Sequence, residues 1–375
     1  GLPEPVLTDI PRDAKTGRPR GFFRKRSWVR QFFQVHGLRA GDTIAIERVE
    51  DYRYVIRPEF PEAEFTVAEF FAGIGLVRLA LEHRGFRVVF ANDIDPQKFA
   101  MYRDNFGADD FALGDIHRLD ADRIPDCDLY TASFPCNDLS IAGAMAGLNG
   151  SQSSAFWGLV RILREKAKRK RLPSLVLLEN VPGFLIAHGG KDFEAALLAL
   201  CELNYACDAL IIDAVHFVPQ SRARLFVIAQ LGVEGRFPFG IDASTVRTQA
   251  LVAFMMTHPH IRWSVRHLPS PPSRGPLLPT ILEDLADNDP AWWNEERTGY
   301  FMNQLSQRHA KVAARMIAGN RYTYATAFRR VRHGRSMAEL RTDGIAGCLR
   351  TPRGGSGRQI LFQAGRAKRR VRLLT

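Results

Sequence analysis

The chain has 375 residues, 46% of them hydrophobic, which is enough to bury the cores of two domains or of one domain with large insertions. No run of about eighteen apolar residues is present and Gly1–Glu4 lacks the layout of a secretion signal, so we expect a cytoplasmic protein without a membrane partner. The formal net charge of +12 favours a polyanionic partner, although a merely soluble basic protein would also carry it.

The five cysteines are odd in number and scattered, and none stands in a CxxC or Cys/His ligand spacing. We therefore expect no structural zinc site, no disulfide framework and no metal cofactor. They are Cys127, Cys136, Cys201, Cys207 and Cys348.

In chain order, the first predicted part is an appended basic module at residues 1–62. A run of basic residues is followed by a predicted turn and strand at Gly41–Glu47. The basic residues are Arg12, Lys15, Arg18, Arg20, Arg24, Lys25, Arg26 and Arg30.

Residues 63–231 alternate apolar runs with amphipathic stretches, which predicts an α/β fold with a mostly parallel sheet and helices on both faces. The predicted strands are Thr66–Phe71, Arg87–Asp93, Asp128–Phe134, Leu175–Val181, Ala206–Asp213 and Arg224–Leu231. The predicted helices are Leu76–Arg84, Pro96–Asn105, Phe156–Lys170 and Lys191–Leu203. Residues 232–346 are rich in Pro, Arg and aromatic residues and predict a smaller, irregular domain, after which we expect 347–375 to return to the larger one.

Three segments of the larger domain favour a nucleotide-like cofactor. The first strand leads into Phe71-Ala72-Gly73-Ile74-Gly75, where glycines let a ligand approach the backbone, although a plain tight turn would look the same. About 20 residues later Asp93 ends the next strand, where a carboxylate can accept both hydroxyls of a ribose. Asp115 and Ile116 could meet an adenine; the alternatives are a helix cap and ordinary core.

Candidate catalytic side chains stand at the ends of three further predicted strands. Cys136 and Glu179 come at the end of a strand, and Arg222 and Arg224 at the start of one. Pro135 holds the thiol of Cys136 at the edge where α/β sheets place active sites, although a free cysteine is more often a small buried apolar residue. Glu179 ends an apolar strand, where a salt bridge alone could also explain it. Arg222 and Arg224 stand two apart in extended chain, so both point the same way and could anchor phosphate or carboxylate, unless they are ordinary surface arginines.

In this order, the segments resemble the motifs of the cytosine-5 DNA methyltransferase family, and the resemblance is specific and covers about Phe65 to Thr375. It implies a Rossmann-like methyltransferase fold that uses S-adenosylmethionine, with residues 232–346 as the target-recognition domain. The matching segments are Phe71–Gly75, Asp93, Gly114–Ile116, Pro135-Cys136 with Ser140, Glu179–Val181 and Gln220–Arg224, and Arg350–Gln359 resembles the motif that follows the recognition region.

The resemblance implies a DNA (cytosine-5-)-methyltransferase of a bacterial restriction-modification system, which acts on double-stranded DNA and releases S-adenosylhomocysteine. Because carbon 5 of cytosine is a poor nucleophile, Cys136 would first add to carbon 6 of a flipped-out base. Glu179 would contact the ring nitrogen and the exocyclic amine, and Arg222 and Arg224 would orient the base and Glu179. Residues 137–154 would close over the base.

The same resemblance assigns the remaining residues. The implied cofactor-binding residues are Phe71, Gly73, Ile74, Gly75, Asp93, Ile94, Asp115, Ile116 and Pro135. The implied substrate-binding residues are Ser140, Asn180 and Gln220, together with Arg329, Arg330 and Arg332 of the recognition domain, where Arg321 and Arg335 are further candidates for groove or phosphate contacts.

Some features depart from the family's pattern. Leu76 stands where members usually carry a further glycine, and Ile94 where an aromatic residue often stacks on adenine. The chain stops at Thr375, before a motif with an asparagine that completes the cofactor pocket, so we expect either an early end or a second polypeptide that supplies this piece, and weak cofactor binding by the chain alone. The module at residues 1–62 is similar to small β-barrel DNA readers fused to restriction-modification enzymes.

Three rival functions remain open at this point. A transfer-RNA methyltransferase of the same family would share the chemistry, but the long basic variable region argues against it. A DNA-binding relative without catalysis would not need Cys136, Glu179 and Arg222. A dehydrogenase that uses a dinucleotide would leave Pro135-Cys136 and Glu179-Asn180-Val181 unexplained.

Overall fold

The computed structural model describes residues 16–18, 27–35, 38, 43–51, 53–59, 64–82, 84–135, 155–237, 239–332, 334–349 and 358–374. Cys136, Ser140 and the predicted closing segment 137–154 lie outside the described residues, as does most of Arg350–Gln359. The chain divides into two compact units, Gly1–Asp115 with Asp122–Tyr130 and Ile116–Ala121 with Thr131–Thr375.

A seven-stranded sheet confirms the predicted α/β fold. Its strands are β3 Phe65–Phe70, β4 Phe86–Asp93, β5 Phe111–Leu113, β6 Leu129–Ala132, β7 Leu175–Asn180, β8 Tyr205–Asp213 and β9 Ala223–Leu231. The strand order is β5-β4-β3-β6-β7-β9-β8. Strand β4 runs parallel to β3 and β5, whereas β9 runs antiparallel to both β7 and β8. All six predicted strands are present, and only the three-residue β5 was not predicted.

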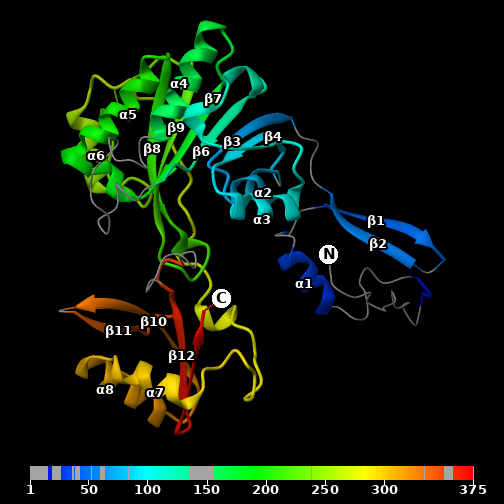
Figure 1. The fold of residues 1–375 in the computed structure, drawn as a ribbon, viewed down its shortest axis with the longest axis vertical. Helices are drawn as coiled ribbons and strands as arrows, with labels where there is room; N and C mark the ends of the chain where they lie inside the picture. Colours follow the sequence, from blue (N-terminus) through cyan, green and yellow to red (C-terminus); the bar gives the residue numbers. More distant parts are fainter. Residues whose placement is uncertain are drawn as a thin grey trace. The chain divides into compact units, whose positions relative to one another are not determined.

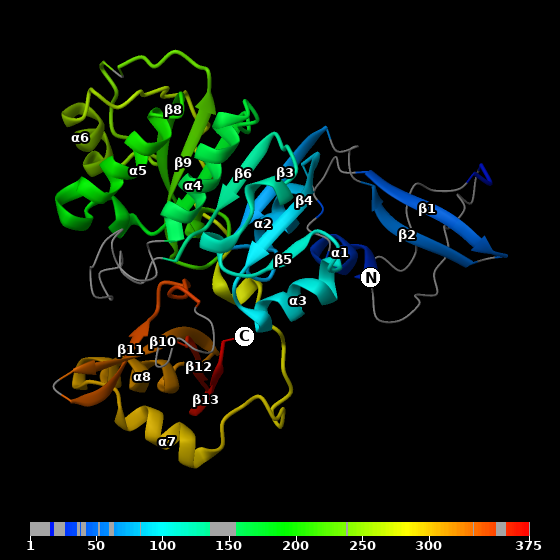
Figure 2. The same ribbon diagram turned by 45° about the horizontal axis from the view of Figure 1, so that its top comes forward.

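The four predicted helices are also present: α2 Leu76–Glu82, α3 Pro96–Phe106, α4 Ala155–Lys168 and α5 Lys191–Cys201. Helix α3 begins where we expected because Asp95 accepts a hydrogen bond from the amide of Gln97 at 2.9 Å and Pro96 occupies the first turn. Helices α2 and α3 contact β4, and α5 contacts β8 (Figures 1 and 2). Short 3-10 turns lie at Ile116–Arg118, Ala121–Arg123, Pro182–Leu185, Ala187–Gly190, Ala214–His216 and Leu278–Thr280.

The region that we expected to be irregular contains regular elements: α6 Gln249–Thr257, α7 Glu295–Asn303, α8 Gln307–Ala318, β10 Thr323–Arg332 and β11 Arg335–Arg341. With β12 Ile360–Gly365 and β13 Lys368–Leu373, the last two strands form an antiparallel sheet of order β11-β10-β12-β13, which we name the recognition sheet. Helices α7 and α8 lie against this sheet (Figure 1). The apolar pattern was weak because the buried positions of β10 and β11 include Ala325, Ala327 and Ala338.

Segment 347–375 divides between two places. Its strands β12 and β13 belong to the recognition sheet rather than to the seven-stranded sheet, whereas Cys348 and Leu349 contact residues just before β9. The predicted domain boundaries after residues 62, 231 and 346 stay predictions.

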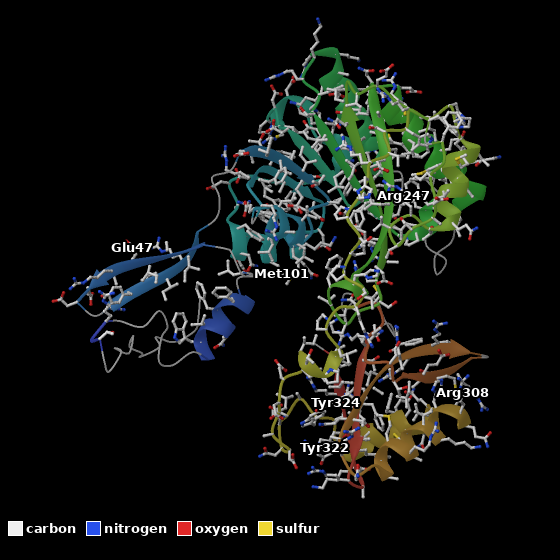
Figure 3. The ribbon with its side chains drawn as sticks, turned by 180° about the vertical axis from the view of Figure 1, so that it is seen from behind. Glu47, Met101, Arg247, Arg308, Tyr322 and Tyr324 are labelled. Carbon is white, nitrogen blue, oxygen red and sulfur yellow. The ribbon has the colours of Figure 1, made fainter. Side chains whose placement is uncertain are left out.

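A buried ion pair anchors the segment around α6 to the seven-stranded sheet. Arg247, labelled in Figure 3, donates to both carboxylate oxygens of Asp208 on β8 at 2.9 and 2.7 Å and to the carbonyl of Arg266 at 2.9 Å. Since both charged side chains are buried, removing either would leave an uncompensated charge in the core.

The N-terminal module is described in part. Helix α1 Ser27–Val35 buries Trp28 and Phe32, and strands β1 Thr43–Glu50 and β2 Arg53–Glu59 form an antiparallel hairpin, where Gly41–Glu47 predicted one strand. Among the described residues no helix is long and apolar enough to cross a membrane.

Candidate active site

The glycine turn after β3 is tied to the end of β4 in the first unit. Phe71, Gly73 and Gly75 have positive φ angles of 58°, 59° and 83°. Asp93, only 4% exposed, accepts a hydrogen bond from the amide of Gly73 at 2.9 Å through one carboxylate oxygen and from the amide of Asp95 at 2.9 Å through the other. The predicted loop and the predicted ribose acid therefore belong to one hydrogen-bonded unit.

This unit fits a nucleoside cofactor. A β-carbon at Gly75 would overlap the ring of Phe106, so only glycine lets α2 approach α3 there, whereas a β-carbon at Gly73 would meet nothing nearer than 3.9 Å, so that side of the turn is open. The Oδ1 atom of Asp93 keeps a second lone pair for a ribose hydroxyl, whereas Oδ2 also accepts a 3.5 Å hydrogen bond from Nζ of Lys98. Ile94, 65% exposed, offers an apolar surface beside it.

The adenine contacts stay predictions. Asp115 is half-buried. In the second unit, Ile116 is buried against α4, because a β-carbon at Gly158 would lie 2.7 Å from its Cγ2 atom. Ile116 thus packs as an ordinary core residue, which was the alternative to an adenine contact.

A buried carboxyl that we did not predict lies beneath the glycine turn. Glu69 on β3 is 1% exposed, and burial raises its pKa from 4.5 to about 8, more than the backbone amide and guanidinium of Arg78 lower it. Among the described residues, no donor lies within hydrogen-bond distance and angle of either carboxyl oxygen of Glu69, so the Arg78 amide acts only as a nearby dipole. At neutral pH this carboxyl is therefore mostly protonated.

We predict that Glu69 makes the chain less stable as the pH rises. Between 4.5 and about 8 the folded state keeps a proton that the unfolded state has released, so the free energy of unfolding falls by at most about 1.4 kcal/mol per pH unit. Glu69→Gln should flatten this decline in urea titrations at several pH values, while the same change at the exposed Glu64 should not. Parallel profiles for wild type and Glu69→Gln would contradict the prediction.

In the second unit, Asn180 connects the ends of β6 and β7. Its Nδ2 atom donates to the carbonyl of Phe134 at 3.3 Å, and its Oδ1 atom accepts from the amide of Val181 at 2.8 Å. Asn180 is buried, and Phe134 directly precedes Pro135, the last described residue before Cys136. This geometry favours positioning of the Pro135-Cys136 segment over the substrate contact that we predicted for Asn180.

Glu179 and Arg224 meet between β7 and β9. The Nε atom of Arg224 lies 2.7 Å from Oε1 of Glu179, and both side chains are partly buried. The antiparallel pairing of Asn180 with Leu225 puts the end of β7 beside the start of β9. The two residues therefore form a carboxylate held in place by a guanidinium, open in part to solvent.

Arg222 and Gln220 contact a segment far along the chain. The Nη1 atom of Arg222 donates to the sulfur of Cys348 at 3.0 Å and to the carbonyl of Leu349 at 3.4 Å. The side-chain oxygen of Gln220 accepts from the amide of Leu349 at 3.2 Å. We did not predict a role for Cys348, because nothing in the sequence pattern pairs it with residues more than a hundred positions earlier.

A family model described as C-5 cytosine-specific DNA methylase matches residues 65–343, which is well over half of the chain. The chain belongs to this DNA methylase family. The resemblance of the motifs is thereby confirmed, and S-adenosylmethionine is the cofactor of the family. The matched range ends before Arg350–Gln359, so the motif proposed there stays a prediction.

Curated relatives of the family are bacterial. The chain is 35% identical over 161 residues to the Type II methyltransferase M.HhaI of Haemophilus parahaemolyticus, covering 43% of this chain and 47% of that protein. It is 34% identical over 185 residues to the Type II methyltransferase M.MspI of a Moraxella species, covering 49% and 43%. The match thus spans less than half of each relative. The crystal structure of the S. pombe Dnmt2 methyltransferase is similar with 23% identity, a TM-score of 0.45, and coverage of 64% of this chain and 67% of that one.

The predicted DNA-contacting arginines of β10 differ from one another. Arg329 is half-buried and stacks over Trp293 at 5.8 Å, and its Nε atom is buried without a partner among the described residues. Arg330 is exposed, 4.7 Å above the ring of Phe328. The side chain of Arg332 lies outside the described part. The side chain of Arg330 is thus more accessible to a phosphate than that of Arg329.

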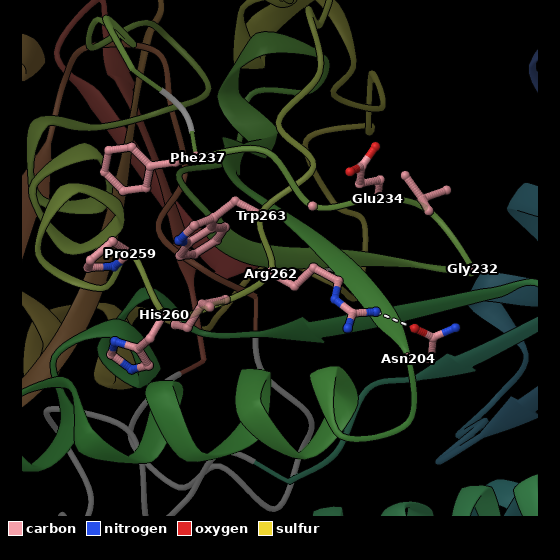
Figure 4. Close-up of a pocket in the computed structure, with 11 residues that line it drawn as sticks. Asn204, Gly232, Glu234, Phe237, Pro259, His260, Arg262 and Trp263 are labelled. Carbon is pink, nitrogen blue, oxygen red and sulfur yellow. Dashed lines mark hydrogen bonds between the residues drawn. The ribbon is translucent and has the colours of Figure 1, made fainter.

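A separate pocket of about 520 Å³ lies beside the start of β8 and the end of β9 (Figure 4). Its lining includes Asn204, His260, Arg262 and Trp263, and Arg262 is hydrogen-bonded to Asn204. None of the predicted site residues lines it. The pocket therefore carries no part of the candidate active site.

Proposed function

We propose that this chain transfers a methyl group from S-adenosylmethionine to carbon 5 of a flipped-out cytosine in a specific sequence of duplex DNA. The observation that carries the proposal is the 2.7 Å pair of Arg224 and Glu179 in a chain of the C-5 cytosine-specific DNA methylase family. Such a pair can hold a carboxylate against a pyrimidine ring, which neither a dehydrogenase nor a binding module requires.

The reaction follows from the chemistry of the residues. The Cys136 thiolate adds to carbon 6 of cytosine, and the carboxyl group of Glu179 gives its proton to the ring nitrogen while it accepts a hydrogen bond from the exocyclic amine, which neutralises the negative charge that the addition creates. Arg224 keeps Glu179 oriented, and Asn180 holds the backbone that leads to Cys136. S-adenosylmethionine supplies the methyl group as an electrophile. Loss of the carbon 5 proton to a solvent water then expels Cys136 as a thiolate, Glu179 takes back the proton from the ring nitrogen, and S-adenosylhomocysteine is the second product.

The residues around the glycine turn would hold the cofactor. Asp93 would accept the ribose hydroxyls, Ile94 would cover the adenine, and Gly73 would leave room for the ligand next to the backbone. The hydrogen bond between Asp93 and Gly73, the exposure of Ile94 and the open side of the turn support these roles. The proposed set also includes Phe71, Ile74, Gly75, Asp115, Ile116 and Pro135.

For the substrate, we propose duplex DNA in a bacterial restriction-modification system. The net charge of +12 suits a phosphate backbone, and two relatives are named Type II methyltransferases. The recognition sheet, through Arg330, would contact base edges or phosphates of the DNA near the target base. The proposed site of action is the bacterial nucleoid.

One experiment tests the proposal. The purified chain is incubated with labelled S-adenosylmethionine, mixed-sequence duplex DNA and transfer RNA in competition, and the modified cytosines are located by sequencing. We expect 5-methylcytosine in one DNA sequence context and none in the RNA. Methylation of the RNA alone, or of neither, would contradict it. A second polypeptide, one of the two alternatives expected from the sequence, is not supported by the similar proteins.

A further inference from the structure

A short segment before the last two strands lies along the residues that precede β9. We name Ala346–Leu349 the strap. The amide of Ala346 donates to the carbonyl of Pro219 and the amide of Ser221 to the carbonyl of Ala346, both at 2.8 Å. With the bond from the Leu349 amide to Gln220, the strap is held at both of its ends.

Gln359, the residue directly before β12, holds the middle of the strap. Its side chain is 5% exposed, and its Oε1 atom accepts a hydrogen bond from the amide of Gly347 at 3.1 Å. A β-carbon at Gly347 would lie 2.8 Å from Nε2 of Gln359, so the amide packs directly on the strap backbone. The Gln359 carbonyl accepts from the amide of Leu374, beyond β13, at 3.0 Å. The strap is therefore fixed to the recognition sheet.

The strap also fixes Arg222. The backbone amide of Arg222 donates to Asp213, at the end of β8, at 2.7 Å, while its guanidinium donates to Cys348 and Leu349 of the strap. The main chain of Arg222 is thus placed by the seven-stranded sheet, and its side chain is placed by the strap.

We propose that Gln359 is a positioning residue for methyl transfer. By fixing Gly347 it holds the strap in the place where Cys348 and Leu349 orient the guanidinium of Arg222. It thereby connects the recognition sheet to Arg222, which lies directly before β9. The inference rests on the proposed function. It adds a chain of contacts, from the recognition sheet through Gln359 and the strap to Arg222, by which a change in the sheet would alter the orientation of Arg222 in the active site.

The test compares Gln359→Ala with Gln363→Ala. Gln363 is a glutamine of the same strand region whose amide bonds Tyr324 within the sheet at 3.2 Å. Single-turnover methyl transfer at saturating DNA and cofactor should be about 10–100-fold slower in Gln359→Ala, since small misplacements of catalytic groups have effects of this size. DNA affinity by fluorescence anisotropy should stay within about twofold, and Gln363→Ala should resemble wild type.

A double-mutant cycle shows whether Gln359 acts through Arg222. In an Arg222→Lys background the further change Gln359→Ala should slow transfer by less than about twofold, because the route is already broken. An equal slowing in both backgrounds, no slowing in the wild-type background, or the same slowing in Gln363→Ala would each overturn the inference.

A readout without turnover separates this inference from the proposed function. The amide of Ser221 should exchange its hydrogen faster in Gln359→Ala than in wild type, and unchanged exchange would overturn the inference even if the chain is active. A wild-type chain that transfers no methyl group would contradict the proposed function instead. If Gln359→Ala unfolds, Gly347→Ala, which adds a methyl group against the Gln359 amide, takes its place with the same expected results.

Discussion

Cys136→Ser should abolish methyl transfer and the covalent complex with DNA. We expect the rate to fall by at least about 10³-fold, because a serine hydroxyl is almost fully protonated at neutral pH and is a far weaker nucleophile than a thiolate. The measurement is the transfer of labelled methyl groups to duplex DNA, together with denaturing electrophoresis of protein trapped on DNA that contains 5-fluorocytosine. Wild type should give a shifted band and Cys136→Ser none.

The matched control for this variant is Cys127→Ser. Cys127 is a half-buried cysteine outside any disulfide, and its thiol donates to the carbonyl of Pro125 at 3.3 Å. It should retain wild-type transfer and trapping. Retained trapping in Cys136→Ser, or loss of trapping in Cys127→Ser, would show that another group is the nucleophile.

Glu179→Gln should lower the rate of methyl transfer by about 10²–10⁴-fold. Glutamine keeps the shape of the side chain and an oxygen for Arg224, but it lacks the carboxylate that can take or share a proton at the ring nitrogen. DNA affinity should change little, because the contact strengthens mainly when the base becomes activated. Single-turnover kinetics and anisotropy separate these two effects.

The partner Arg224 makes this prediction sharper. Arg224→Ala should slow transfer by a similar factor, and the double variant should be little slower than either single variant, because the two side chains act as one unit at 2.7 Å. Glu194→Gln serves as the control, since Glu194 also pairs with a basic side chain, that of His260 at 2.7 Å, outside the candidate site. Additive losses at Glu179 and Arg224 would refute the joint role.

The sequence predicted the seven-stranded sheet well for a physical reason. Buried parallel strands form continuous apolar runs, and the polar residues directly after them mark the functional edge. Asp93 and Glu179 were predicted in this way, and their roles stay predictions. The structure ties Asp93 to the glycine turn and pairs Glu179 with Arg224. The two-residue spacing of Arg222 and Arg224 predicted that both side chains point the same way. It could not show that Arg222 contacts Cys348 whereas Arg224 contacts Glu179.

The recognition sheet and the residues that hold the site were harder to predict. Alanine at the buried positions of β10 and β11 gives little contrast with polar neighbours, so the apolar period is lost. Arg329 illustrates a second limit, because a basic residue on the inner face of a strand packs on Trp293 and no local pattern shows this. Contacts such as Gln359 with Gly347 depend on the tertiary fold alone.

The direction of β9 has a consequence for engineering. Because β9 is antiparallel to its neighbour β7, the first residues of β9, and not its last, lie beside Glu179 and Asn180 at the end of β7. Extra residues inserted between Asp213 and Gln220 would shift both arginines at once, whereas an insertion at Gly232, past the opposite end of the same strand, would leave them where they are. A tag or fused domain is therefore best accommodated at Gly232.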